Sequence, residues 1–252
     1  MRFASLGSGS AGNGLVVEAG RTRVMLDCGF GLSDTISRLA RLGLQPSDLA
    51  GIVITHEHSD HIGGAGRFAR KHTLPVWLTA GTLSMAQDMG QTDVRVIDSH
   101  ALFEIGDLAI QPFPVPHDAR EPVQFVFGDG ARRLGVLTDV GCSTQHIETM
   151  LADVEALVLE CNHDRTMLAQ GAYPAGLKQR VGGRFGHLEN GQSAELLGKL
   201  KHDKLQCVMA AHISRKNNTP ALARRALAQV LNCVDDEVRV ACQFAGFDWI
   251  RI

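Results

Sequence analysis

Seven consecutive residues constrain the fold of this chain more than any other stretch: Thr55-His56-Glu57-His58-Ser59-Asp60-His61. They follow a short apolar run, residues 51–54, which predicts a buried strand. They precede a segment with helical character that ends near His72. A strand that ends in His and Asp residues and continues into a helix places polar side chains at the carboxyl edge of a sheet. Ligands of α/β proteins bind at that edge, so we expect the functional site there.

The spacing of these residues indicates metal binding. In an extended segment the side chains of His56 and His58 point to the same side, because side chains alternate with a period of two. The two imidazoles can therefore hold one ion. Asp60 and His61 lie where the chain turns into the helix and can reach a second ion. Imidazole and carboxylate ligands without a thiolate suit zinc, manganese or iron. The alternative is a surface loop rich in His and Asp, which the density of the pattern disfavours.

The remaining composition is that of a globular protein. Hydrophobic residues make up 44% of the 252 residues and charged residues 21%, as in soluble domains. No apolar run approaches the roughly 20 residues of a membrane helix, and the N-terminus lacks the pattern of a secretion signal. The six cysteines are scattered without a C-x-x-C pair, which is typical of free thiols in a reducing compartment. We expect a single cytoplasmic domain over residues 1–252, without membrane contact and with the oligomeric state open.

Charge is unevenly distributed along the chain. Residues 165–225 contain eleven Lys or Arg and three Asp or Glu, a net charge of +8, which leaves −10 for the rest. A basic block beside an acidic remainder favours a polyanionic partner, although solvated helix faces explain it equally well.

The first glycine-rich segment does not predict a dinucleotide site. Residues 7–12 match G-x-G-x-x-G, but that motif must open a helix. Here residues 14–19 and 22–27 follow, and both read as strands. We interpret the glycines as a tight loop between strands, whose free N–H groups can approach a phosphate.

The pattern H-x-H-x-D-H after an apolar strand resembles the signature of the metallo-β-lactamase fold superfamily. This resemblance implies an α/β (α+β) fold, a four-layer αββα sandwich, with a one- or two-metal hydrolytic site between the sheets. Further positions match in order along the chain. Asp27 corresponds to an aspartate that orients the ligand loop without being a ligand. His117 corresponds to the third ligand of the first ion, and His212 corresponds to a ligand of the second ion. Asp139 corresponds to the residue that bridges the two ions.

Flanking motifs are similar to one branch of that superfamily. The segments G-S-G-S-A-G-N, E-C-N-H-D, G-H-L-E-N and H-I-S-R-K-N-N-T-P resemble the YycJ family, also called WalJ, which is related to RNase Z and RNase J and whose members act as exonucleases on DNA. RNase Z carries a Glu–His couple for proton transfer, and Glu160 and His187 fall in matching order. His163 either joins them or is a hydrogen-bonded structural residue. The inserted domain of RNase J and the transfer-RNA arm of RNase Z have no counterpart here, which disfavours tRNA processing.

The resemblance implies two divalent ions, Zn²⁺ or Mn²⁺, and cleavage of a DNA phosphodiester by a hydroxide that bridges them. His56, His58 and His117 are expected to hold one ion, and Asp60, His61 and His212 the other, with Asp139 between them. Asp60 can serve as ligand and base at once, and His187, oriented by Glu160, is the expected general acid. The polar run after His212 suggests substrate contacts by four residues: Ser214, Arg215, Lys216 and Asn218.

The ligand set alone does not select the substrate, because an activated water also attacks carbonyl carbon. Two other readings therefore stay open beside the metal-dependent exonuclease. One is a small-molecule hydrolase, either a cyclic phosphodiesterase or a glyoxalase-II-like thioesterase. The other is a non-enzymatic scaffold, against which the complete set of candidate ligands argues.

Overall fold

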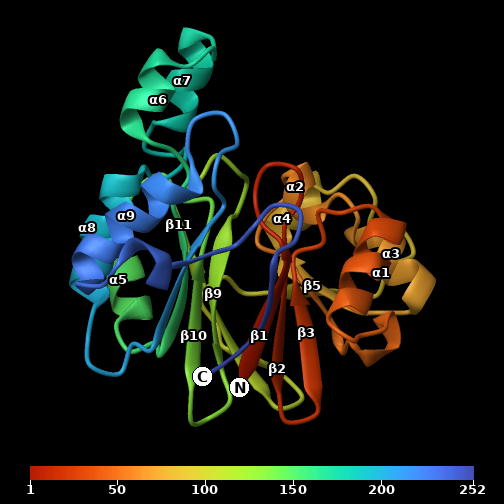
Figure 1. The fold of residues 1–252 in the computed structure, drawn as a ribbon. Coiled ribbons are helices and arrows are strands. Elements are labelled where there is room, and N and C mark those ends of the chain that lie inside the picture. The colour runs from red at the N-terminus through yellow and green to blue at the C-terminus, as the bar shows by residue number, and fades with distance from the viewer.

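A computed structural model describes all 252 residues as two facing sheets with helices on both outer sides (Figure 1). The first sheet has seven strands in the order β14-β1-β2-β3-β4-β5-β6. Its strands are β1 (Arg2–Gly7), β2 (Gly14–Ala19), β3 (Thr22–Leu26), β4 (Gly51–Val53), β5 (Val76–Thr79), β6 (Val94–Ile97) and β14 (Phe247–Arg251). Neighbouring strands from β3 to β6 run parallel.

The second sheet also has seven strands, in the order β13-β12-β11-β10-β9-β8-β7. They are β7 (Phe103–Ile105), β8 (Leu108–Pro114), β9 (Val123–Gly128), β10 (Arg133–Leu137), β11 (Ala156–Glu160), β12 (Cys207–Ala211) and β13 (Arg239–Val240). Strands β10 to β13 run parallel, and β8 and β9 pair antiparallel.

Helices cover the outer face of each sheet (Figure 1). Those beside the first sheet are α1 (Leu32–Arg41), α2 (Ser59–Ile62), α3 (Ala65–His72) and α4 (Ala80–Met85), with a short 3-10 turn, η1 (Pro46–Asp48). Those beside the second sheet are α5 (Gln145–Leu151), α8 (Asn190–Leu200) and α9 (Pro220–Leu231), followed by a second 3-10 turn, η2 (Asp235–Glu237). These are the four layers that the family resemblance implied.

Strand periodicity explains the layers. In β3, Val24 and Leu26 belong to the cluster between the sheets, whereas Met25 packs under the helices of the first sheet. In β11, Val158 faces the partner sheet and Leu159 faces the helices of the second sheet. Because side chains alternate along a strand, apolar residues on both faces make each strand bury two surfaces.

One pair of helices stands apart from the layers. Helices α6 (Arg165–Gln170) and α7 (Ala175–Val181) project from the sandwich at the end opposite to the two chain termini (Figure 1). No helix in the structure has both the length and the apolar character needed to cross a membrane.

Candidate metal centre

The site residues follow the carboxyl ends of strands from both sheets. Asp27 follows β3, the His-rich stretch follows β4, and His117 follows β8 by a few residues. Asp139 and His212 come just after β10 and β12. Three of these residues, Asp27, Asp139 and His212, have positive φ angles of 60°, 51° and 52°. Residues other than glycine adopt this backbone at a cost, and such positions cluster at functional sites.

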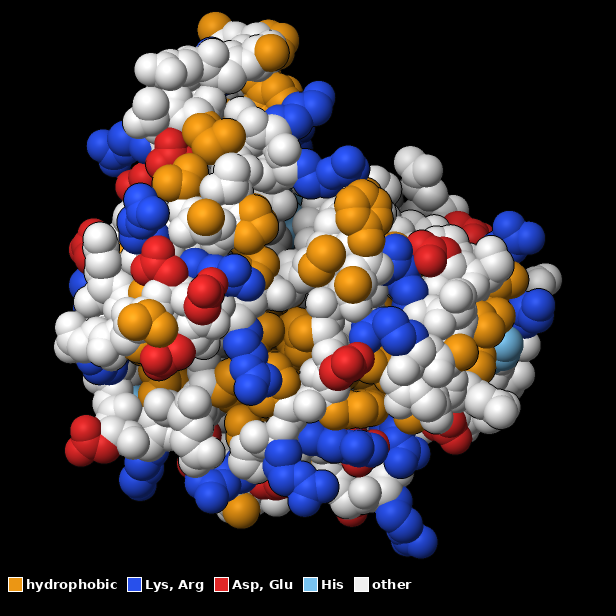
Figure 2. Space-filling model, in the orientation of Figure 1, with side chains coloured by type: hydrophobic (Ala, Val, Ile, Leu, Met, Phe, Trp, Pro, Cys, Tyr) orange, Lys and Arg blue, Asp and Glu red, His pale blue; other side chains and the backbone are white.

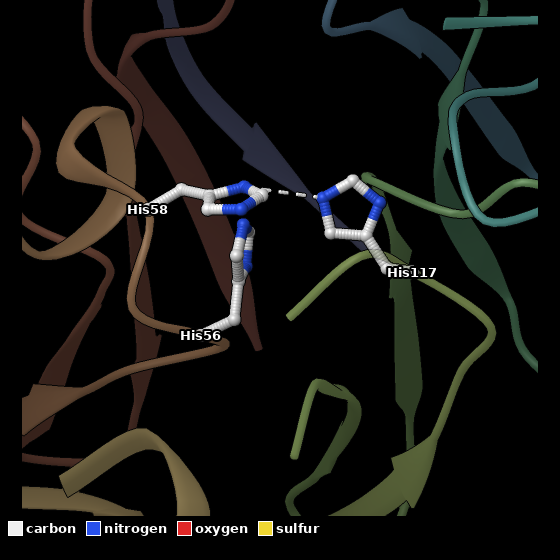
Figure 3. A group of neighbouring side chains, drawn as sticks. All are labelled: His56, His58 and His117. Carbon is white, nitrogen blue, oxygen red and sulfur yellow. Dashed lines mark hydrogen bonds between the residues drawn. The ribbon is translucent and has the colours of Figure 1, made fainter. Parts of the chain in front are cut away.

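Three imidazoles from the two sheets form the first group. The rings of His56 and His58 come from the loop after β4 and face that of His117 (Figure 3). His58 Nδ1 lies 3.3 Å from His117 Nε2. His117 Nδ1 lies 3.0 Å from the carbonyl oxygen of Gly186, and His56 Nδ1 lies 2.9 Å from the Thr55 hydroxyl. In both rings Nδ1 is therefore held by a hydrogen bond, and Nε2 points toward the space between the three imidazoles.

Asp60, His61 and His212 form the second group. Asp60 Oδ2 lies 3.6 Å from Nε2 of His61 and 3.6 Å from Nε2 of His212. The outer nitrogen of each ring contacts a carboxylate: His61 Nδ1 lies 2.7 Å from Asp27 Oδ2, and His212 Nδ1 lies 3.1 Å from Glu160 Oε1. A carboxylate behind an imidazole fixes the tautomer and leaves Nε2 as the free donor atom, as is usual behind metal-binding histidines.

Asp139 lies between the two groups. Its Oδ2 is 3.1 Å from His61 Nε2, and its Oδ1 is 3.9 Å from His117 Nε2. The side chain is almost fully buried, and it is close enough to His56 and His61 for the three to share one cation.

Three buried atoms at this place make no hydrogen bond of good geometry: His56 Nε2, Asp139 Oδ2, despite its 3.1 Å contact with His61 Nε2, and His212 Nε2. Buried polar atoms without a partner destabilise a fold and are rare. Cations held by the two groups would give each of these three atoms a partner, because His56 and Asp139 share one candidate group and His212 belongs to others. The nitrogen and oxygen donor set is one that Zn²⁺ and Mn²⁺ accept, so the residues present fit a metal ion.

The electrostatics also fit a cation. Burial lowers the pKa of His212, but the three surrounding carboxylates outweigh burial and raise it to about 10. Burial raises the pKa of Asp60, but the neighbouring imidazoles of His212 and His61 lower it to about 2. The carboxylates thus hold protons on His61 and His212, which metal binding would replace, whereas burial lowers the pKa of His56 and His117.

Glu160 joins the metal groups to His187. Its carboxylate is fully buried and accepts hydrogen bonds from the backbone N–H groups of Asp139, Val140 and Leu188. Its Oε1 lies 2.8 Å from His187 Nδ1. Burial raises the pKa of Glu160, but His187 and His212 outweigh it and lower it to about 2. Burial lowers the pKa of His187, and Glu160 more than offsets this and raises it.

Five of the site residues line a cleft of about 390 Å³: His58, Asp60, Asp139, His187 and His212. Helix α7, which sequence patterns did not predict, contributes one wall through Leu177, Arg180 and Val181. The sequence of residues 165–181 does not predict helices, because α6 and α7 are short, are separated by Gly171 and Pro174, and lack an apolar stripe. The glycine-rich loop contributes Ser10 to the cleft, while its Asn13 amide lies 3.1 Å from His61 Nε2.

The four predicted substrate contacts do not line this cleft. Asn218 is buried, and its side-chain amide bonds to Asn190 and to the carbonyl of Cys161. Ser214 is buried as well and accepts a hydrogen bond from the Asn217 backbone. These two side chains therefore hold the shape of their loop and do not line the cleft, and their contact with a substrate stays a prediction.

Arg215 and Lys216 are exposed and rest on aromatic rings outside the cleft. The Arg215 guanidinium lies 5.0 Å from the Phe244 ring centre, and Lys216 Nζ lies 5.5 Å from that of Tyr173. Figure 2 shows basic side chains over both halves of the viewed face, with acidic ones among them. Not every base between residues 165 and 225 lies at the cleft: Lys199, for example, pairs with Glu148 on the outer layer of helices.

His163 is a buried ring whose Nδ1 has no hydrogen-bond partner. Burial lowers its pKa to about 4, so the ring is neutral. It pairs through its backbone with Glu189 and does not line the cleft.

The chain is similar to known proteins over nearly its whole length. The β-lactamase superfamily domain matches residues 22–213. Exodeoxyribonuclease YycJ of Bacillus anthracis is 35% identical over 92% of this chain and 89% of its own. Exodeoxyribonuclease WalJ of Streptococcus pneumoniae is 30% identical over 98% of this chain and 93% of its own.

Solved structures share the fold at low identity. The metallo-β-lactamase fold protein YhfI of Bacillus subtilis superposes with a TM-score of 0.78 at 16% identity, covering 99% of this chain and 98% of its own. Zn²⁺-bound PqqB of Methylobacterium extorquens superposes with a TM-score of 0.74 at 17% identity over the full length of both chains. At such identity these likenesses concern the fold alone.

Proposed function

This chain belongs to the β-lactamase superfamily, and from that membership we propose that it is a metal-dependent exonuclease that hydrolyses phosphodiester bonds of DNA. The observation that carries the proposal is the pair of side-chain groups joined by Asp139, with three buried donor atoms that lack partners. The names of the two relatives, which align over most of both chains, support DNA as the substrate.

The proposed centre takes two divalent ions, Zn²⁺ or Mn²⁺. His56, His58 and His117 would hold one ion, and Asp60, His61 and His212 the other, with Asp139 between them. Asp27 and Glu160 would orient His61 and His212 through their outer nitrogens. Bound divalent ions supply Lewis acidity, which lowers the pKa of water and offsets negative charge on phosphoryl oxygens.

The chain's own residues would handle the protons. Asp60, a member of the second group, lines the cleft and can accept the proton of the attacking water. His187 also lines the cleft with Nδ1 held by Glu160, so its Nε2 is free to donate a proton to the leaving oxygen. Such proton transfer contributes about 10²–10⁴ to a rate. Arg215 and Lys216, on the surface after His212, would meet phosphates further along the strand.

The first test is degradation of end-labelled duplex DNA by the manganese-loaded protein. We expect wild type to release label, His58→Ala to release none, and a chelator to abolish the activity of wild type. His100→Ala, which changes an exposed histidine outside the cleft, is the matched control and should be fully active. Intact DNA with a protein that has bound two metal ions would exclude the nuclease, and S-lactoylglutathione and cyclic nucleotides would then be the substrates to assay.

A further inference from the structure

Arg180 on helix α7 is the only lysine or arginine that lines the cleft. The other charged or titratable residues of the lining are three aspartates, Asp60, Asp118 and Asp139, and three histidines. A phosphodiester that enters this cleft therefore meets one fixed cation of the chain.

The carboxylate of Asp118 connects this arginine to the candidate metal site. Asp118 Oδ2 accepts a hydrogen bond from Arg180 Nε. Its other oxygen, Oδ1, lies 3.4 Å from His117 Nε2 and 3.8 Å from His58 Nε2. One small anion with two oxygens thus spans the gap between the guanidinium and two imidazoles of the first group.

A phosphodiester has the same recognition chemistry as this carboxylate. Both present two oxygens that share a negative charge, and the planar fork of a guanidinium matches either one. We propose that Arg180 binds the phosphate of the scissile phosphodiester, and that Asp118 occupies this place when substrate is absent. The inference rests on the proposed function and names the residue that selects a phosphate over an uncharged ester.

The local structure suits an exchange of partners. Leu177, Arg180 and Val181 share one face of α7 because residues three and four apart lie side by side, and this face lines the cleft. The end of the helix is fixed, since the His187 N–H donates to the Val181 carbonyl. The Arg180 side chain is 61% exposed, and half-exposed ion pairs are weak. A phosphate can therefore displace Asp118 without unfolding α7.

The test compares Arg180→Gln and Arg180→Lys with wild type, each loaded with manganese and measured for metal content. The substrate is the p-nitrophenyl diester of thymidine monophosphate, and equilibrium binding uses thymidine monophosphate and uncharged thymidine. For Arg180→Gln we expect KM and the monophosphate Kd to rise about 10- to 100-fold, because charge-assisted hydrogen bonds are lost. Thymidine binding and metal content should not change. The KM and monophosphate Kd of Arg180→Lys should lie between those of wild type and Arg180→Gln.

Arg165→Gln is the matched control. Arg165 is also an exposed arginine of the projecting helices, it also faces an acidic partner, Glu189 at 3.4 Å, and it lies outside the cleft. Its substitution should leave every value as in wild type.

Asp118→Ala tests the second half of the inference. Removing the resident carboxylate should tighten monophosphate binding about two- to fivefold at unchanged metal content. Weaker binding, or loss of metal, would show that Asp118 serves the site in another way and would overturn its role as occupant.

The outcomes separate this inference from the proposed function. Phosphodiester cleavage by wild type with unchanged KM and Kd in Arg180→Gln would overturn the inference and leave the function standing. Arg180-dependent binding of the monophosphate without any cleavage would overturn the proposed function and leave the inference about Arg180 standing. Equal losses for thymidine and its monophosphate would show that α7 shapes the cleft and that its arginine does not recognise phosphate.

Discussion

At the residue scale, the proposed proton transfer depends on how one buried carboxylate, Glu160, is shared between two histidines. Glu160 faces two imidazoles and three backbone N–H groups, so its negative charge is fully compensated inside the protein. The resemblance to RNase Z predicts its pairing with His187, because Glu160 and His187 lie in two motifs that match in order. Its contact with His212 is not predictable in that way, since it depends on β11 and β12 lying side by side in register.

Glu160→Gln should change the pH dependence of the reaction. Glu160 raises the pKa of His187, so this proposed general acid stays protonated to a higher pH than an ordinary histidine. In wild type the rate should therefore fall only as pH rises through this raised pKa, which gives the alkaline limb of the pH profile. In Glu160→Gln this alkaline limb should lie at lower pH. The maximal kcat should also fall about 10²-fold. A pH profile of kcat for both proteins measures this, and an unmoved limb would contradict the role given to His187.

At the element scale, close backbone contacts position the His-rich loop. A Cβ at Gly29, just after β3, would lie 1.8 Å from the carbonyl oxygen of Asp60, and the Cys28 N–H donates to the His61 carbonyl. Sequence patterns predict the strands on either side of this contact from their apolar residues. They do not predict the contact, because no side chain makes it.

Gly29→Ala should accordingly displace the loop that carries Asp60 and His61. We expect a loss of about 3 kcal/mol in the free energy of unfolding from overpacking, together with weaker zinc binding. Gly90→Ala is the control, because a Cβ at Gly90 meets nothing within 4 Å, and it should stay within about 0.5 kcal/mol of wild type. Urea unfolding and zinc titration of both variants measure the effect. Equal stabilities would mean that the backbone around Gly29 can relax.

At this scale, the projecting helices α6 and α7 are the elements that the sequence does not predict. Strands with apolar residues on both faces and long helices such as α9 are predictable, because burial imposes a period on their sequences. The residues of α7 are mostly exposed or half-buried, so burial leaves little pattern to read. Arg180, the cation of the cleft, lies on this element, and the basic block alone did not distinguish it from the other ten bases.

At the scale of the whole molecule, the candidate centre joins the two halves of the sandwich. The donors after β4 belong to the first sheet, whereas His117, Asp139 and His212 belong to the second. Ions bound between them would hold the native state together and would have no such site in the unfolded chain. Binding to the native state alone stabilises it by about 2.7 kcal/mol at a ligand concentration 100 times Kd.

Removing the metal should therefore lower the stability of the entire chain as well as its activity. For a protein of 252 residues, such a stabilisation corresponds to a fall of about 5–10 °C in Tm. We expect a chelator to lower the Tm of wild type by this amount and added zinc to restore it, whereas Asp139→Asn, which removes charge between the two groups, should respond weakly to either. The His100→Ala protein should respond as wild type does. If chelator and zinc leave the Tm of wild type unchanged, the unpartnered atoms of His56, Asp139 and His212 are not metal donors. The apolar cluster and the direct polar contacts between the two sheets then hold them together without bound ions.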